Sequence, residues 1–191
     1  MAFNIHLLHD IVFYLLYAMA AIVTFIAIER IIFYAFTIRQ TRLCLESNQA
    51  PNANSVVADM VTPLQAAEFG HASRHQIEDL AESGYIKVRT QLVHHLWALD
   101  TIVTAAPLLG LVGTIFGIID TFSALASSGI SDPSAVSAGI GTALYATALG
   151  IGVALYGLIF YNLFHNRVER ISDKIKLIIL KFSGANPQAS A

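Results

Sequence analysis

Charged residues are absent from three long stretches of the chain. Residues 11–28 carry no charge, and after Glu29 and Arg30 come eight more uncharged residues. A second uncharged run covers residues 101–119, and a third covers residues 133–164. About 20 apolar residues suffice for a helix to cross the hydrocarbon core of a bilayer. The pattern therefore predicts an all-α membrane protein with three transmembrane helices.

Helix signals also occur between the first and second uncharged stretches. Thr62, Pro63 and Gln65 form a capping-box pattern with proline at the first helical position, and Ser73 and Gln76 form a second such pattern. After the second pattern, apolar residues recur at near-heptad spacing, and no helix breaker precedes the second uncharged stretch. We therefore expect a single helix from about residue 73 to 126. The apolar positions that support it are Ile77, Leu80, Val88, Leu92, Leu96 and Leu99.

The third helix is expected to continue beyond the bilayer. Its last part has an apolar face, and charged residues occupy the other positions, as in an amphipathic helix. Gly184 and Pro187 are typical of a helix end. The apolar face comprises Val168, Ile171, Ile175, Ile178 and Phe182.

The distribution of basic residues predicts the orientation. All 11 Lys and Arg residues lie either between Arg30 and Arg89 or between Arg167 and Lys181. Because basic residues favour the cytoplasmic side, both segments are expected there, so that the second and third helices extend into the cytoplasm. The predicted order is a first transmembrane helix at 1–39 with its N-terminus outside, a cytoplasmic helical segment at 40–98, a second transmembrane helix at 99–127, an outer loop at 128–134, a third transmembrane helix at 135–165, and a cytoplasmic C-terminal helix and tail at 166–191.

Composition supports a membrane protein and offers little for catalysis. The chain is 55% hydrophobic and 13% charged, with a mean hydropathy of +0.62, which is too apolar for an ordinary soluble domain. Its one cysteine, Cys44, excludes an internal disulfide and a cysteine cluster for zinc. His71 and His75 have a spacing compatible with metal, but no third ligand is evident and a solvated helix face explains them better. We expect no enzymatic activity, no metal, no cofactor and no nucleic-acid partner.

Small residues form a seam along each of the last two transmembrane stretches. Such residues let helices approach closely in lipid, where little hydrophobic force drives helices together. Ordinary helix packing explains Gly110, Gly113, Gly117 and Gly150 individually. Together the seams exceed what three helices need internally, so we expect several subunits to form a ring.

Threonines provide the candidate ion pathway. Thr114, Thr121, Thr142 and Thr147 lie in otherwise apolar stretches. Each hydroxyl can simply bond to a carbonyl of its own helix, but several together can line a path for hydrated protons or sodium ions. Asp120 is the only carboxylate well inside an apolar stretch, and we assign it a possible charge role. Snorkelling to the nearby outer surface or pairing with a neighbouring subunit is the alternative.

Two segments carry a family resemblance. Residues 106–119, APLLGLVGTIFGII, resemble the second-span signature of the ExbB/TolQ/MotA family of proton channels. Residues 139–150, GIGTALYATALG, resemble the third-span signature, and Glu29-Arg30 is a weaker match at the end of the first span. The order of one span, a cytoplasmic segment and two further spans is also that of the family. Within the family the chain is most like ExbB.

The resemblance implies a motor in the bacterial inner membrane, with the N-terminus and the outer loop in the periplasm. A homopentamer would surround a dimer of a single-span partner, ExbD-like or TolR-like, which carries a membrane aspartate. The proton motive force would move that dimer, and a TonB-like energy transducer would carry the work toward the outer membrane. By motif position, Thr114 and Thr147 correspond to pore-facing threonines.

One position departs from the family pattern. Where many ExbB and TolQ proteins have a glutamate in the third span, this chain has Thr142, so the coupling ion can be sodium as well as a proton.

A substrate transporter would be expected to have broken helices and internal repeats across more spans. The alternatives that stay open are a TolQ-type subunit, a MotA-type stator subunit, and a non-conducting membrane scaffold.

Overall fold

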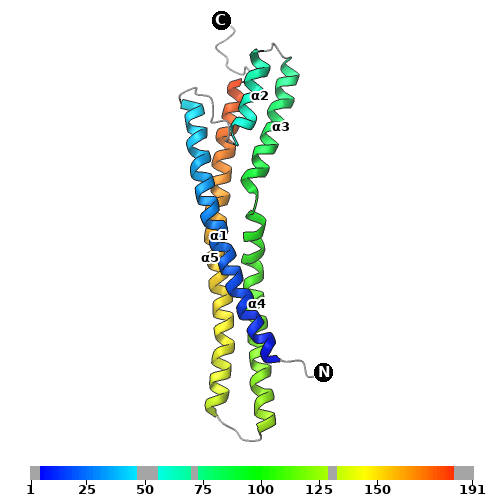
Figure 1. The fold of residues 1–191 in the computed structure, drawn as a ribbon, viewed down its shortest axis with the longest axis vertical. Coiled ribbons are helices and arrows are strands. Elements are labelled where there is room, and N and C mark those ends of the chain that lie inside the picture. The colour runs from blue at the N-terminus through cyan, green and yellow to red at the C-terminus, as the bar shows by residue number, and fades with distance from the viewer. Residues whose placement is uncertain (1–4, 47–55, 70–72, 129–132, 183–191) are drawn as a thin grey trace. The chain divides into compact units, whose positions relative to one another are not determined.

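The computed structural model describes residues 5–46, 56–69, 73–128 and 133–182 of the chain. Its described residues form helices and contain no strand, so the predicted all-α class is confirmed. The five helices, drawn in Figure 1, are α1 (Ile5–Glu46), α2 (Ala58–Phe69), α3 (Arg74–Val93), α4 (Leu96–Ser128) and α5 (Pro133–Phe182).

Three helical stretches each contain an apolar part that is long enough to cross a membrane. They cover Leu7–Leu43, His75–Ser127 and Pro133–Leu180. Large apolar side chains are exposed along each of them, for example Phe25 at 71% and Ile159 at 66%. Lipid is the solvent that accepts such a surface. The chain is therefore a multi-pass membrane protein with three spans, as the sequence predicts.

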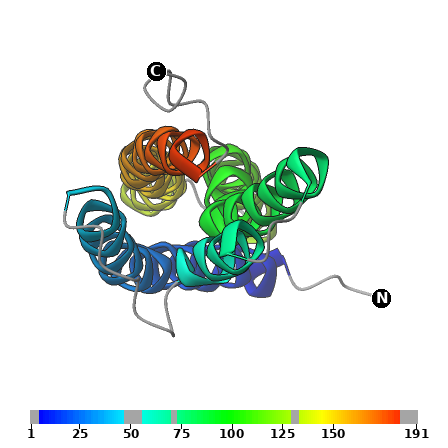
Figure 2. The same ribbon diagram turned by 90° about the horizontal axis from the view of Figure 1, so that it is seen from above.

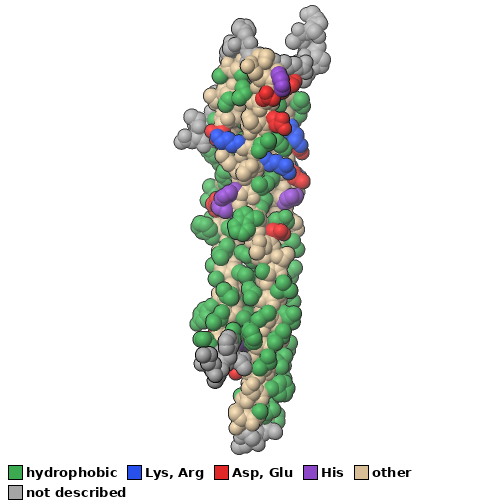
Figure 3. Space-filling model, turned by 90° about the vertical axis from the view of Figure 1, so that its right-hand side faces the viewer, with side chains coloured by type: hydrophobic (Ala, Val, Ile, Leu, Met, Phe, Trp, Pro, Cys, Tyr) green, Lys and Arg blue, Asp and Glu red, His purple; other side chains and the backbone are tan. Residues whose placement is uncertain are grey.

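The chain divides into two compact units. The first, which we call the apolar unit, comprises residues 1–27 and 97–162; the second, which we call the charged unit, comprises residues 28–96 and 163–191. Helices α1 and α5 each contribute to both units. On the face shown in Figure 3, side chains of the apolar unit are mostly hydrophobic, whereas those of the charged unit include most of the Lys, Arg, Asp and Glu.

In the apolar unit, parts of α1 and α5 pack with α4 around small residues. Ala106, Ala143 and Ala146 are fully buried. A Cβ added to Gly113 would lie 2.9 Å from the Ala146 Cβ and 3.0 Å from a methyl carbon of Val12 on α1. Small side chains therefore let all three helices approach one another closely.

In the charged unit, α2 packs against α3, as Figure 2 shows from above. The side chain of Met60 on α2 covers Gly84 on α3, and Lys87 pairs with Asp59 at 3.0 Å. Helix α5 turns one apolar face inward, which confirms the predicted amphipathic continuation of the third helix. The buried residues of that face are Val168, Ile171, Ile175 and Ile178.

One of the two predicted helix starts is confirmed and the other is wrong. Ser73 caps α3, and its side chain and that of Gln76 form both bonds of a capping box. Helix α2 does not start at Thr62 but at Ala58, so Pro63 lies inside it. Burial explains the earlier start, because Met60, Val61 and Leu64 are almost completely enclosed and extend the apolar face toward the N-terminus. Gly184 and Pro187, the predicted end of the last helix, lie outside the described residues.

The single helix expected from 73 to 126 is also wrong, because α3 ends at Val93 and α4 begins at Leu96. Between them His95 has a φ of 69°, a left-handed conformation that is uncommon for a residue other than glycine. The carbonyls at the end of α3 find partners on α1. Arg30 Nη1 donates to the Gln91 carbonyl at 3.2 Å, and the Tyr34 hydroxyl donates to the Leu92 carbonyl at 2.7 Å. A cation and a hydroxyl thus satisfy the helix end that the break leaves open.

Candidate functional site

The apolar unit brings two of the four candidate threonines together. Thr114 on α4 and Thr147 on α5 are hydrogen-bonded through their hydroxyls, and both side chains are half-buried. The Thr147 hydroxyl also reaches the Gly110 carbonyl at 3.1 Å. The Thr114 hydroxyl lies 3.1 Å from the Gly110 carbonyl and 3.2 Å from the Ala143 carbonyl. The result is a small polar cluster inside an otherwise apolar helix pair.

Close contact of the two backbones makes this hydroxyl pair possible. A Cβ added to Gly110 would lie 2.9 Å from the Ala146 carbonyl oxygen. One added to Gly150 would lie 2.5 Å from the Ala106 carbonyl oxygen. A Cβ on Gly117 would be 2.8 Å from the Ala143 Cβ. All these contacts lie within one chain, so these glycines give no separate support for contacts between subunits.

The hydroxyl pair offers more acceptor positions than hydrogens. Each hydroxyl supplies one hydrogen and two lone pairs. One hydrogen forms the bond between the two hydroxyls, and the other can go to the carbonyl of Gly110 or Ala143, which still leaves lone pairs on Thr114 and Thr147. Oxygen lone pairs suit water, a hydrated proton or a sodium ion. Neither hydroxyl titrates near neutral pH, so the pair can orient an ion or water but cannot itself release a proton there.

The other two threonines lie apart from this pair. Thr121 donates to its own helix at the Gly117 carbonyl, 2.7 Å away, and its side chain packs against Gly139 of α5. It therefore faces α5 from α4, as Thr114 does. Thr142 is exposed and donates to the Ala138 carbonyl at 3.0 Å, so it bonds within its own helix.

Asp120 is half-exposed on α4. Among the described residues, no side chain or backbone group pairs with its carboxylate. It is therefore outside the polar cluster of Thr114 and Thr147.

A histidine that is not among the predicted site residues also reaches α4. His9 on α1 stacks edge-on against Phe13, with ring centroids 5.0 Å apart. Its Cδ2 would lie 3.3 Å from a Cβ at Gly117, and its Nε2 is buried without a hydrogen-bond partner among the described residues. The signal in the sequence was a histidine two residues before an uncharged stretch.

The charged unit has its own polar cluster at the break between α3 and α4. Arg30 is 4% exposed, and its Nη2 lies 3.4 Å from Glu29 Oε1 and 3.0 Å from His95 Nδ1. The same His95 nitrogen lies 2.9 Å from Glu29 Oε2. This nitrogen either accepts a hydrogen bond from Arg30 or donates one to Glu29, and the tautomer of the His95 ring decides between the two.

The candidate metal pair is not assembled in the part of the chain that the structure describes. His75 is exposed and lies 3.5 Å from Asp79, one helical turn away. His71 lies outside the described residues.

Known proteins resemble this chain, and the family match begins after α1. Residues 52–176 match the MotA/TolQ/ExbB proton channel family. An ExbB homolog from Methanothermobacter thermautotrophicus is 38% identical over 114 residues, 60% of this chain and 40% of the relative. The biopolymer transport proteins ExbB of Aquifex aeolicus and Helicobacter pylori are 35% and 37% identical, each over 46% of this chain and 60% of the relative. The chain thus spans 40 to 60% of the length of these relatives. With a family match over more than half of its residues, the chain belongs to the MotA/TolQ/ExbB proton channel family.

Proposed function

We propose that the chain is the ExbB-like, channel-forming subunit of an inner-membrane motor driven by the proton motive force. In this proposal it works with an ExbD-like single-span partner and energises TonB-dependent transport across the outer membrane. The observation that carries the proposal is the hydroxyl pair of Thr114 and Thr147 inside an apolar helix pair. Family membership and the ExbB names of its relatives support it.

The chemistry of the pair explains why a partner is needed. Each elementary charge that crosses 100 mV releases about 2.3 kcal/mol. Threonine hydroxyls can orient water or an ion on this path but cannot take up and release its charge. A carboxylate on the partner would do so, which suits a chain whose third span carries Thr142 and no carboxylate of its own. The coupling ion is a proton or sodium.

Ring formation belongs to the same proposal. Gly141 and Gly152 on α5 have no neighbouring atom within 4 Å of an added Cβ, unlike Gly110 and Gly150. They leave a smooth strip of the third span free for another helix. We assign this strip to contact with the partner or with the next subunit of a homopentamer. The proposed orientation places the N-terminus in the periplasm and the charged unit in the cytoplasm.

A non-conducting scaffold is the second candidate, and one observation favours it. The hydroxyls of Thr114 and Thr147 can satisfy each other and the nearby carbonyls without any ion. On this alternative the pair is only an interhelical bond that holds α4 to α5.

Ion flux separates the two candidates. The chain would be reconstituted in vesicles with and without an ExbD-like partner, and flux would be followed after an imposed potential, once in sodium-free buffer and once with sodium. The motor predicts flux that requires both proteins, and the required ion identifies the coupling ion. A complex that assembles fully but passes neither ion would support the scaffold instead.

A further inference from the structure

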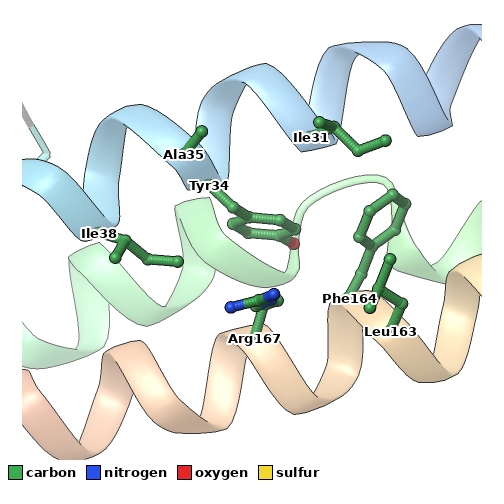
Figure 4. A pocket seen from close by; sticks show the side chains of 7 residues that line it. All are labelled: Ile31, Tyr34, Ala35, Ile38, Leu163, Phe164 and Arg167. Atoms are coloured by element: carbon green, nitrogen blue, oxygen red, sulfur yellow. The ribbon is translucent and has the colours of Figure 1, made fainter.

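An apolar pocket opens between α1 and α5 in the charged unit. It has a volume of about 380 Å³, which is within the usual range of small-ligand pockets, about 300–1,000 Å³. Tyr34 and Phe164 form an aromatic wall, with ring centroids 5.6 Å apart. Figure 4 shows these rings between the two helices, with Arg167 below Tyr34. Aliphatic side chains complete the lining, among them Ile31, Ile38 and Leu163.

The pocket lies where both helices change from apolar to charged sequence. On α1 the last lining residue, Ile38, is followed by Arg39. On α5 the uncharged stretch ends at Phe164, and Arg167 follows one turn later. Headgroups and the first carbons of the acyl chains meet at such a boundary in a bilayer. The position therefore suits a lipid that lies along the two helices.

Cations extend the pocket on one side. A second hollow of about 290 Å³ shares Ile38 and Arg167 with the first and adds Arg170 and Lys174. Among the described residues, nothing pairs with the Arg167 guanidinium or the Lys174 ammonium, and Arg170 bonds only to the neutral side chain of Asn166 at 3.2 Å. The one carboxylate of this hollow, Asp173, lies 3.4 Å from Lys176.

From this combination we infer that the groove between α1 and α5 binds an anionic phospholipid. One acyl chain occupies the apolar pocket, and the phosphate lies against Arg167 and Lys174. Charge complementarity selects the ligand, because unpaired cations beside an apolar hollow suit a phosphate joined to hydrocarbon. A guanidinium can also bind a phosphate through two parallel hydrogen bonds. A zwitterionic lipid such as phosphatidylcholine also carries a phosphate, but the quaternary ammonium of its headgroup offsets that charge, so these cations attract it less. A second copy of the chain would need carboxylates at the same place.

The test measures lipid binding to the purified full-length chain by native mass spectrometry. Phosphatidylglycerol and phosphatidylcholine with the same acyl chains are added in turn. Each cation near a membrane surface contributes about 1 kcal/mol, which is about a fivefold change in affinity. Arg167→Gln and Lys174→Gln are each expected to weaken phosphatidylglycerol binding about fivefold. Arg89→Gln, which removes an exposed cation of α3 outside the groove, should leave it unchanged.

A second pair of variants tests the apolar half. Ala35 lines the pocket, so Ala35→Leu should fill it and reduce binding of the lipid. Ala21→Leu, at an exposed position of the same helix, should not. Excess glycerol phosphate should fail to displace the lipid, because it lacks the acyl chain. The inference is overturned if both lipids bind equally, if Arg167→Gln binds like the unchanged chain, or if glycerol phosphate displaces the lipid fully. It is also overturned if the single chain binds the lipid but the assembled subunits do not, which would mean that a second copy covers the groove.

Discussion

Arg30 Nη2 lies 3.0 Å from Nδ1 of His95, the residue with a left-handed backbone between α3 and α4. The same guanidinium donates to the Gln91 carbonyl at the end of α3. Arg30 of α1 thus contacts the break between α3 and α4.

Replacing Arg30 should destabilise the chain. Arg30→Met keeps most of the side-chain volume but leaves the Gln91 carbonyl and Glu29 without their cation. Hydrogen bonds to charged groups contribute about 1.5–3 kcal/mol, and we expect a loss of this size in thermal unfolding in detergent. Arg39→Met, at an exposed position of the same helix, serves as control and should change stability by less than about 0.5 kcal/mol. Equal stability of the two variants would mean that the Arg30 contacts do not contribute to the stability of the chain.

The backbone at His95 can be tested separately from its imidazole. His95→Gly and His95→Ala both remove the ring, but only glycine accepts a φ of 69° without steric cost. The left-handed conformation costs other residues about 1–2 kcal/mol, so the glycine variant should be the more stable of the two by about that amount. The comparison is made by thermal unfolding under identical conditions. A more stable alanine variant would indicate that α3 and α4 form one continuous helix there.

Two glycines of α5 should respond differently to the same substitution. Gly150→Ala would place a Cβ 2.5 Å from the Ala106 carbonyl oxygen, and such overpacking costs about 1–3 kcal/mol. At Gly152 the space is open, so Gly152→Ala should leave the unfolding temperature of the chain unchanged or raise it slightly. Gly152→Leu then tests the proposed subunit contact, and native mass spectrometry should record smaller assemblies. If Gly152→Leu assembles normally, this strip is not the contact between subunits.

Orientation can be tested at the only cysteine of the chain. The proposed topology places Cys44 in the cytoplasm, because all 11 basic residues lie in the charged unit, which the proposal assigns to that side. A membrane-impermeant thiol reagent should modify it only after the cells are permeabilised. Labelling of intact cells would reverse the proposed orientation.

Local patterns predicted the spans and one cap, whereas contacts between distant residues were not predictable. Ser73 and Gln76 are three residues apart, and their capping box follows from sequence alone. The break at His95 depends on Arg30 and Tyr34, which are more than 50 residues away in the chain. No glycine or proline marks that break, so near-heptad spacing across it predicted one helix.

The same difference between local patterns and distant contacts applies to the candidate site. The sequence indicated that hydroxyls occur in the spans but could not indicate which ones meet. Thr114 and Thr147 are brought together because Gly110 and Gly150 let α4 and α5 touch, while Thr142 faces outward one turn away from Ala146. His9 was missed because it precedes the uncharged stretch, and its contact with α4 depends on how the helices cross.

The central proposal is that ions pass the hydroxyl pair of Thr114 and Thr147. Valine has the shape of threonine without the hydroxyl, so Thr114→Val and Thr147→Val should abolish ion flux while the assembly stays intact. Thr104→Val is the matched control, because that hydroxyl is exposed and bonds only within α4. Asp120→Asn should be milder than either change at the pair, since its carboxylate is outside the polar cluster.

The most direct measurement is ion flux into vesicles that hold the chain and its partner, compared for these four variants side by side. The proposal predicts loss of flux for Thr114→Val and Thr147→Val, full flux for Thr104→Val, and at most a partial loss for Asp120→Asn. Normal flux in both variants of the pair, with none in Asp120→Asn, would contradict it and move the path to Asp120.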